Sequence, residues 1–238
     1  MIETTADDDN IVLFSIKKSH DSIPFCFEFE KKCHSIIDNH TKVLVITSEL
    51  ENFAQYCHIN NEDDCIGVIN TLIDIKIPII AAIESGAKSY GLELALACDI
   101  RVCNKDATFA LNQISDGMPF RGATQILPRL IGKGRALDMI LTSKEINATE
   151  AKEMGLISYI NDHSAIDKAI CIARSISKNT APVATRFAKE SIINGLNMTL
   201  RQGILFESDL NIILHSTRDR AEGIEAFVQR RPPEYLGE

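Results

Sequence analysis

The sequence predicts an α/β fold in which parallel strands are joined by helices and the last quarter of the chain is helical. Two observations support this prediction. Short β-branched runs alternate with stretches of helical periodicity in the first part of the chain, and the strand signals fade beyond Leu156. Parallel neighbours need a long crossover, usually a helix, so the alternation favours parallel pairing. The length of 238 residues allows one large domain, or one domain with a small appendage.

The first half of the chain alternates strand and helix patterns. The strand-like runs are bounded by polar residues or Pro, and the helical stretches repeat apolar residues every three or four positions. We expect strands at Ile11–Ile16, Lys42–Thr47, Ile77–Glu84 and Ile100–Cys103, and helices at Phe25–Asn39, Asp63–Ile75 and Leu92–Cys98. A short turn of Ser89, Tyr90 and Gly91 leads into the last of these helices.

Helical patterns dominate the second half. Asp116–Ala123 holds two Gly and one Pro, which is typical of a turn. We expect a helical stretch at Gln125–Leu141 that is punctuated by Pro128, Gly132 and Gly134. Three further helices are expected at Ala165–Ser177, Val183–Asn194 and Leu200–Ser216, with breaks at Pro182 and near Gly195. We therefore divide the chain into a core at residues 1–180 and a helical region at residues 181–238.

Charge and composition exclude several classes of protein. The 33 acidic and 25 basic residues give a net charge of −8, so we expect neither nucleic acid nor a membrane surface as a partner. No apolar run approaches the roughly 18 residues of a membrane span, and Met1–Asn10 lacks signal-peptide features, which predicts a cytoplasmic protein. The seven Cys are scattered without a CxxC pair or a metal-ligand spacing, so we expect reduced thiols and no metal site.

Unusual residues are concentrated around one acid, Glu93. The buried strand at Ile77–Glu84 runs into the Ser89–Gly91 turn and then into a short apolar helix that carries this acid. Backbone N–H groups at a helix start carry positive partial charge and can hold an oxyanion. Two interpretations of Glu93 stay open. It offsets the helix dipole, or it is a carboxylate among apolar neighbours whose raised proton affinity suits a general acid or base.

Two segments of the chain resemble a known family. One is Ile77–Ile157, which contains IPIIAAIESGAKSYGLELALACDIRVC and FALNQISDGMPFRGATQILPRLIGKG, and the other is the ending RDRAEGIEAFVQRRPPEYLGE. Together they resemble the crotonase superfamily, also called the enoyl-CoA hydratase/isomerase family. The resemblance implies a crotonase-like spiral of ββα units, with the helical region at 181–238 as a trimerisation region. It also implies a homotrimer or hexamer and an acyl-CoA thioester substrate, with coenzyme A as part of the substrate and no separate cofactor.

The resemblance also assigns roles to individual residues. Members of the family stabilise a thioester enolate with two backbone N–H groups, which at the matching positions here belong to Cys57 and Tyr90. Gly91 then lies in the substrate-binding turn. Glu93 matches the first of two glutamates that hydratases of the family use, and Gln113 stands where the second is usual. An amide orients water but exchanges no proton near neutral pH, so efficient two-glutamate hydration is not expected.

Several activities remain compatible with one acid and an oxyanion hole. A single base can move a proton between carbons and so isomerise a double bond. Malonyl-type decarboxylation needs no second glutamate, because loss of carbon dioxide itself generates the enolate. Hydration with Asp116 as the second acid is a third possibility, although Asp116 also suits a turn. A catalytically weak acyl-CoA-binding subunit is the alternative from outside the enzyme class.

Three further residues are candidates for substrate contact. Arg121 lies in the loop where some family members place a catalytic Asp. It either contacts solvent or a neighbouring subunit, or it binds a substrate carboxylate, which would favour decarboxylation. Phe227 and Arg230 match a C-terminal pattern that lines the adenine and phosphate region of coenzyme A in the family, sometimes from the neighbouring subunit. A packing Phe and a surface Arg fit these two positions equally well.

Overall fold

The computed structural model describes residues 2–7, 9–17, 25–37, 40–54 and 63–238. Within this part of the chain, a main sheet has the strand order β1-β2-β3-β4-β6-β9. Its strands are β1 (Ile2–Ala6), β2 (Ile11–Ile16), β3 (Val43–Ser48), β4 (Ile79–Ile83), β6 (Ile100–Asn104) and β9 (Tyr159–Asn161). β1 pairs with β2 antiparallel, and every pair from β2 to β9 is parallel. The predicted α/β fold with parallel pairing is therefore confirmed.

A second, smaller sheet lies beside the first. It consists of β5 (Gly86–Lys88), β7 (Thr108–Ala110) and β8 (Ile146–Asn147), with β5 parallel to β7 and β8 antiparallel to it. Strand β5 follows β4 almost directly and leads into the helix α3 (Tyr90–Leu96). The small sheet thus fixes where α3 begins and which segment lies next to it.

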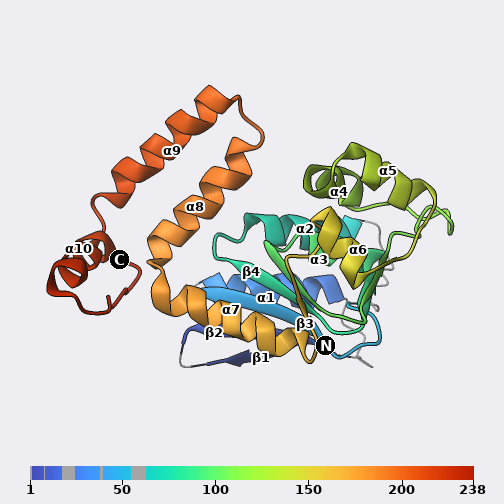
Figure 1. The fold of residues 1–238 in the computed structure, drawn as a ribbon, viewed down its shortest axis with the longest axis horizontal. Helices are drawn as coiled ribbons and strands as arrows, with labels where there is room; N and C mark the ends of the chain where they lie inside the picture. Colours follow the sequence, from blue (N-terminus) through green and yellow to red (C-terminus); the bar gives the residue numbers. More distant parts are fainter. Residues whose placement is uncertain (1, 8, 18–24, 38–39, 55–62) are drawn as a thin grey trace.

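Helices cover both faces of the main sheet (Figure 1). The core helices are α1 (Phe25–Ile37), α2 (Asp63–Asp74), α3, α4 (Ala123–Ile131), α5 (Lys133–Leu141), α6 (Ala148–Met154) and α7 (Ala165–Asn179). Successive side chains of a strand point to opposite faces. Val45 of β3 accordingly belongs to the cluster formed with α7, whereas Leu44 and Ile46 belong to the larger cluster that includes α1, α2 and α3. Because both faces are covered, the central strands are continuously apolar.

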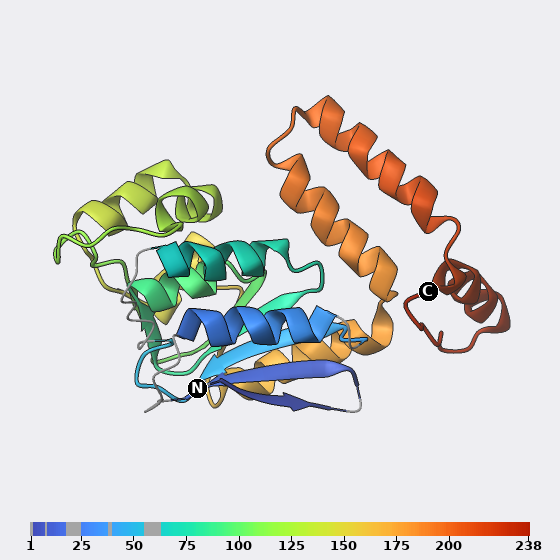
Figure 2. The same cartoon turned by 180° about the vertical axis from the view of Figure 1, so that it is seen from behind.

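The last three helices extend away from the sheet (Figure 2). They are α8 (Pro182–Gly195), α9 (Leu200–Leu214) and α10 (Arg218–Gln229). Helix α8 buries none of its residues, and α9 buries only Leu210. Large apolar side chains are exposed on this region, among them Ile192, Leu196, Leu200, Ile204, Leu205, Ile212, Ile213 and Phe227. Such an apolar surface is typical of a protein–protein contact.

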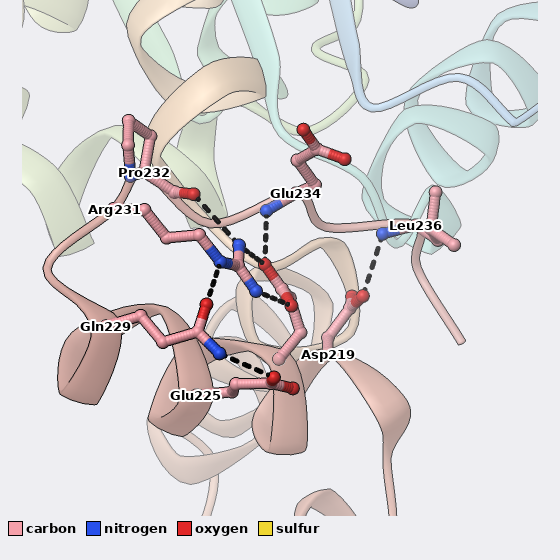
Figure 3. Close-up of polar contacts among 8 residues, drawn as sticks. Asp219, Glu225, Gln229, Arg231, Pro232, Glu234 and Leu236 are labelled. Atoms are coloured by element: carbon pink, nitrogen blue, oxygen red, sulfur yellow. Dashed lines mark hydrogen bonds and ion pairs between the residues drawn. The ribbon is translucent and has the colours of Figure 1, made fainter.

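The C-terminal tail folds back onto α10 (Figure 3). Arg231 forms a bidentate ion pair with Glu222, with N–O distances of 2.6 and 2.8 Å. The backbone N–H of Glu234 donates to Glu222, and that of Leu236 donates to Asp219, both at 2.8 Å. Charged hydrogen bonds of this kind are among the stronger ones, and they fix the tail against α10.

The structure refines the expectations about the second half. The helical stretch expected at Gln125–Leu141 consists of two helices that meet at Gly132, one of the residues expected to punctuate it, where φ is 83°. The turn expected at Asp116–Ala123 ends earlier, since α4 begins at Ala123. Strand β9 lies beyond Leu156, where no strand was expected, and at three residues it is too short to produce a period-two pattern.

The boundary between the core and the C-terminal helices follows the two helices that flank it. Helix α7 packs on the sheet and ends at Asn179, and α8 begins at Pro182, where proline suits the first helical turn. The division at residue 180 stays a prediction. Across the described segments, no helix is both long enough and apolar enough to cross a bilayer.

Candidate active site

Glu93 lies in the first turn of α3 and is buried, with 1% of its surface exposed. The turn before α3 is held by two hydrogen bonds of Ser89. Its backbone N–H donates to the carbonyl of Ala110 at 3.0 Å, and its hydroxyl donates to Oδ1 of Asn112 at 2.6 Å. Ser89 adopts φ 48° and ψ −122°, which is uncommon for a residue with a side chain. The turn therefore ties the start of α3 to the segment that carries Gln113.

Gln113 and the loop before α4 supply the hydrogen bonds of the Glu93 carboxylate. Nε2 of Gln113 donates to Oε1 of Glu93 at 2.7 Å. The backbone N–H of Arg121 donates to Oε2 at 2.6 Å, and the backbone N–H of Ala123 donates as well. Burial raises the pKa of Glu93 to about 7, although these donors act in the opposite direction. A carboxyl group that titrates near neutral pH is suited to both accepting and donating a proton.

The amide of Gln113 is oriented by this carboxylate. Because an ionised carboxylate only accepts hydrogen bonds, the Nε2 end of the amide must face Glu93. The other end, Oε1, is buried and has no hydrogen-bond partner among the described residues. It can therefore accept a hydrogen bond from a water molecule or a substrate placed beside Glu93.

A pocket opens onto Glu93, Tyr90 and Arg121. Its other walls are apolar side chains of α1, α2 and α3, namely Phe25, Val68, Ile69 and Leu94. The guanidinium of Arg121 lies over the Tyr90 ring, with Cζ 4.0 Å from the ring centroid. The pocket thus combines a largely apolar wall with one carboxyl group and one guanidinium group. A mainly apolar lining with a few polar groups is usual for a small-molecule site.

Gly91 allows the start of α3 to pack against another segment of the chain. A Cβ atom at this position would overlap the carbonyl oxygen of Phe53. Phe53 is itself fixed, since its backbone N–H donates to the carbonyl of Gly86 at 2.8 Å. The segment that begins at Phe53 leads toward Cys57, which lies outside the described residues. Tyr90, the other expected oxyanion donor, is the first residue of α3.

The model of the enoyl-CoA hydratase/isomerase family matches residues 37–238. The chain belongs to this family. Among solved structures, an enoyl-CoA hydratase from Bacillus anthracis superposes with a TM-score of 0.89 at 32% identity, covering 100% of this chain and 99% of that one. This similarity confirms the predicted crotonase-like fold with a helical C-terminal region.

Two curated relatives illustrate the range within the family. A mitochondrial methylglutaconyl-CoA hydratase of Mus musculus is 40% identical over 177 residues, which cover 72% of this chain and 56% of the relative. The chain therefore spans little more than half the length of that relative. A 2,3-dehydroadipyl-CoA hydratase of Escherichia coli is 34% identical over 212 residues, covering 84% of this chain and 83% of the relative.

Some residues that family resemblance implicates are not near Glu93. Phe227 is 84% exposed on α10, and Arg230 directly follows this helix. Helix α10 lies at one end of the molecule, well apart from α3, which lies within the body beside the sheet (Figure 1). A single chain of this family member therefore does not bring Phe227 and Arg230 to the pocket. Asp116 is exposed in the turn after Gln113 and does not line the pocket.

Two contacts of the site are not predicted by the sequence pattern. Asn112 binds Ser89, and the ring of Tyr90 forms the surface on which Arg121 lies. Asn112 directly precedes Gln113, but nothing in the local pattern predicts its partner 23 residues earlier in the chain. Both contacts arise because the small sheet brings α3 and the segment after β7 together.

Proposed function

We propose that the protein is an acyl-CoA-transforming enzyme in which Glu93 is the single acid/base and a thioester enolate is the intermediate. The observation that carries this proposal is the buried Glu93, whose pKa is about 7 and whose carboxylate faces a pocket beside the Gln113 amide. The backbone N–H groups of Cys57 and Tyr90 are proposed to hold the enolate oxygen, and such donors stabilise a transition state strongly. Coenzyme A enters as part of the substrate, with no separate cofactor.

Proton transfer between carbons is the chemistry that the site supports best. Glu93 in its ionised form removes a proton from the carbon next to the thioester or from one further along, and then returns it to another carbon. The double bond thereby moves, and the two N–H groups hold the negative charge in between. This sequence uses one carboxyl group, which is what the described part of the pocket contains.

Hydration is the second candidate, because both relatives described above are named as hydratases. The free Oε1 of Gln113 could hold the attacking water, with Glu93 accepting its proton. Malonyl-type decarboxylation remains the alternative within the fold, and an acyl-CoA-binding subunit remains the alternative outside catalysis.

Incubating the protein with enoyl- and malonyl-type thioesters separates these outcomes by product mass. A gain of water, an unchanged mass with a new retention time, and a loss of carbon dioxide identify the three reactions, whereas binding without any turnover contradicts the enzyme proposal.

Replacing Gln113 by Glu is expected to raise hydration of a short trans-2-enoyl-CoA by about 10²-fold or more. The new carboxyl group would lie within hydrogen-bond distance of Glu93, so that the two share a proton and supply both a base and an acid. The loss of the enoyl chromophore measures the rate. Gln113→Met, which keeps the volume but has no titratable group, serves as the control and should show no gain. A wild-type rate equal to that of Gln113→Glu would contradict the single-glutamate proposal.

We also propose that α8–α10 assemble the chain into a homotrimer or hexamer, since these helices expose many large apolar side chains. Light scattering should then give a mass three or six times the 26.4 kDa of one chain. Ile204→Glu combined with Leu205→Glu is expected to shift the mass toward the monomer, because a charge replaces buried apolar area worth about 1.5–3 kcal/mol per side chain. Ile204→Leu with Leu205→Ile keeps the apolar area and should retain assembly. A monomeric wild type would contradict the proposal.

A cytoplasmic location stays a prediction, as the mouse relative is named mitochondrial.

A further inference from the structure

Arg121 is a buried charge that opposes the rise that burial causes in the pKa of the nearby Glu93, but no ion pair joins the two side chains. Arg121 is only 9% exposed. Its Nε and Nη1 atoms are buried and have no hydrogen-bond partner among the described residues. Guanidinium groups stay charged at any ordinary pH. Burial of such a group is unfavourable unless an acceptor offsets the lost hydration, so buried charges in proteins are normally paired.

The guanidinium is held in a defined position. It stacks on the Tyr90 ring at 4.0 Å, and the backbone N–H of the same residue is bonded to Glu93 at 2.6 Å. The Tyr90 hydroxyl contacts the carbonyl of Pro119 at 3.4 Å, which links the ring to the same loop. Stacking leaves the in-plane N–H groups available. Nε and Nη1 each share an edge of the guanidinium with Nη2, so either edge can bind a carboxylate through two parallel hydrogen bonds.

The carboxylate of Glu93 is not the missing partner. Its Oε1 accepts from the Gln113 amide and its Oε2 accepts from the Arg121 backbone, and the Arg121 side chain bonds to neither oxygen. Arg121 and Glu93 nevertheless line the same pocket. An anion bound to Arg121 would therefore lie beside the carbon atoms on which Glu93 is proposed to act. The phosphates of coenzyme A are at the far end of the pantetheine arm, so the anion must belong to the acyl group.

We propose that Arg121 binds a second carboxylate on the acyl group, so that the preferred substrate is the coenzyme A monothioester of a dicarboxylic acid. This inference rests on the proposed function, because it takes the Glu93 pocket as the acyl site. Arg121 is then a specificity-determining residue. The carboxylate either lies on the carbon next to the thioester, as in a malonyl-type group, or further along the chain, as in a glutaryl-type group.

Binding of saturated thioesters tests this inference by affinity rather than by turnover, with product analysis after each titration to establish that malonyl-CoA is recovered intact. Calorimetry would compare glutaryl-CoA with pentanoyl-CoA, and malonyl-CoA with propanoyl-CoA, in each case a carboxylate against a methyl group at equal chain length. We expect the wild type to bind at least one dicarboxylic thioester about 10- to 100-fold more tightly than its neutral match, the range for hydrogen bonds to a charged group. Preference in the malonyl pair assigns the carboxylate to the carbon next to the thioester, and preference in the glutaryl pair assigns it further along.

Variants of Arg121 show whether this residue causes the preference for dicarboxylic thioesters. Arg121→Met keeps most of the stacked length without the charge and is expected to abolish the preference, and Arg121→Lys should retain part of it. Arg129→Met removes the same charge from an exposed site on α4 and serves as the matched control, with the preference intact. Circular dichroism and thermal unfolding establish that each variant is folded. Equal affinity within both pairs, or a preference that survives Arg121→Met, would overturn the inference. The affinity comparison does not require turnover. If the activity assay fails, the measured affinities still decide whether Arg121 binds a carboxylate.

Discussion

Replacing Glu93 by Gln is expected to lower turnover of an enoyl-CoA by about 10²- to 10⁴-fold, the usual size of general acid–base assistance. The amide has nearly the same shape as the carboxyl group but neither accepts nor donates a proton at neutral pH. In the wild type, a pKa of about 7 implies that the rate of proton abstraction rises with pH through neutrality, as the ionised form becomes dominant. The rate is measured across pH 5–9 on whichever thioester the wild type converts. Unchanged turnover in Glu93→Gln would remove Glu93 from the mechanism.

The variant should fold, because every hydrogen bond of the site can be kept. The new carbonyl oxygen accepts from the backbone N–H of Arg121, and the new amide nitrogen faces Gln113. Rotation of the Gln113 amide then presents its Oε1, which has no partner in the wild type, to that nitrogen. Loss of activity in Glu93→Gln is therefore expected without loss of structure, which circular dichroism can check.

The pH dependence of stability gives an independent measurement of the same group. The pKa of Glu93 is raised in the folded protein from an ordinary value of 4.5 to about 7, so the folded state binds its proton more tightly than the unfolded state. Stability from this group is fully present below pH 4.5 and is lost as pH rises to 7, by about 3 kcal/mol in total. Glu93→Gln has no titratable group at this position, so its stability does not fall in this way as pH rises. Its free energy of unfolding relative to the wild type is expected to rise by about that amount between pH 4 and pH 8, and a constant difference would contradict the raised pKa.

Gly91→Ala is expected to lower the free energy of unfolding by about 3 kcal/mol or more, at the upper end of overpacking effects. The new Cβ overlaps the carbonyl oxygen of Phe53, which is backbone and cannot rotate away. Phe53 is in turn bonded to Gly86, so relief of the overlap must displace either α3 or the segment that leads to Cys57. Activity should fall with stability, because both proposed enolate donors belong to these two segments. Urea unfolding and turnover are the measurements.

Gly134→Ala is the matched control for this substitution. Gly134 lies in α5, and a Cβ atom there would meet nothing within 4 Å. Because Ala favours the helical conformation by up to about 1 kcal/mol over Gly, the control should be neutral or slightly stabilising. If Gly91→Ala were as stable and active as this control, the tight packing of α3 against Phe53 would play no part in the site.

The sequence predicted the elements whose pattern is set by burial. The runs at 43–46 and Ile79–Ile83 are apolar throughout because both faces of the sheet are covered, and α7 shows a clear helical repeat. It did not predict Gly86–Lys88 or Thr108–Ala110, because strands of three residues are too short to show a period. These short strands nevertheless place α3 beside the segment of Gln113.

The candidate site likewise has features that the sequence predicts and features that only the folded structure shows. Family resemblance pointed to Glu93 and Gln113, and the structure adds their direct hydrogen bond of 2.7 Å. The stacking of Arg121 on Tyr90 could not be anticipated, since these residues are far apart in the chain and meet only through tertiary folding. The role of Cys57 stays a prediction.

If α8–α10 assemble the chain as proposed, the stability of α8 and α9, which bury almost no residues within one chain, depends on protein concentration. Helices of 14 and 15 residues are marginal in water on their own, and α8 and α9 contact each other but bury almost no side chains, so they need a further surface against which to pack. A partner that binds only the folded form stabilises it in proportion to the logarithm of its concentration. The melting of α8–α10 should therefore shift with dilution, whereas the melting of the sheet and its covering helices depends on contacts within one chain.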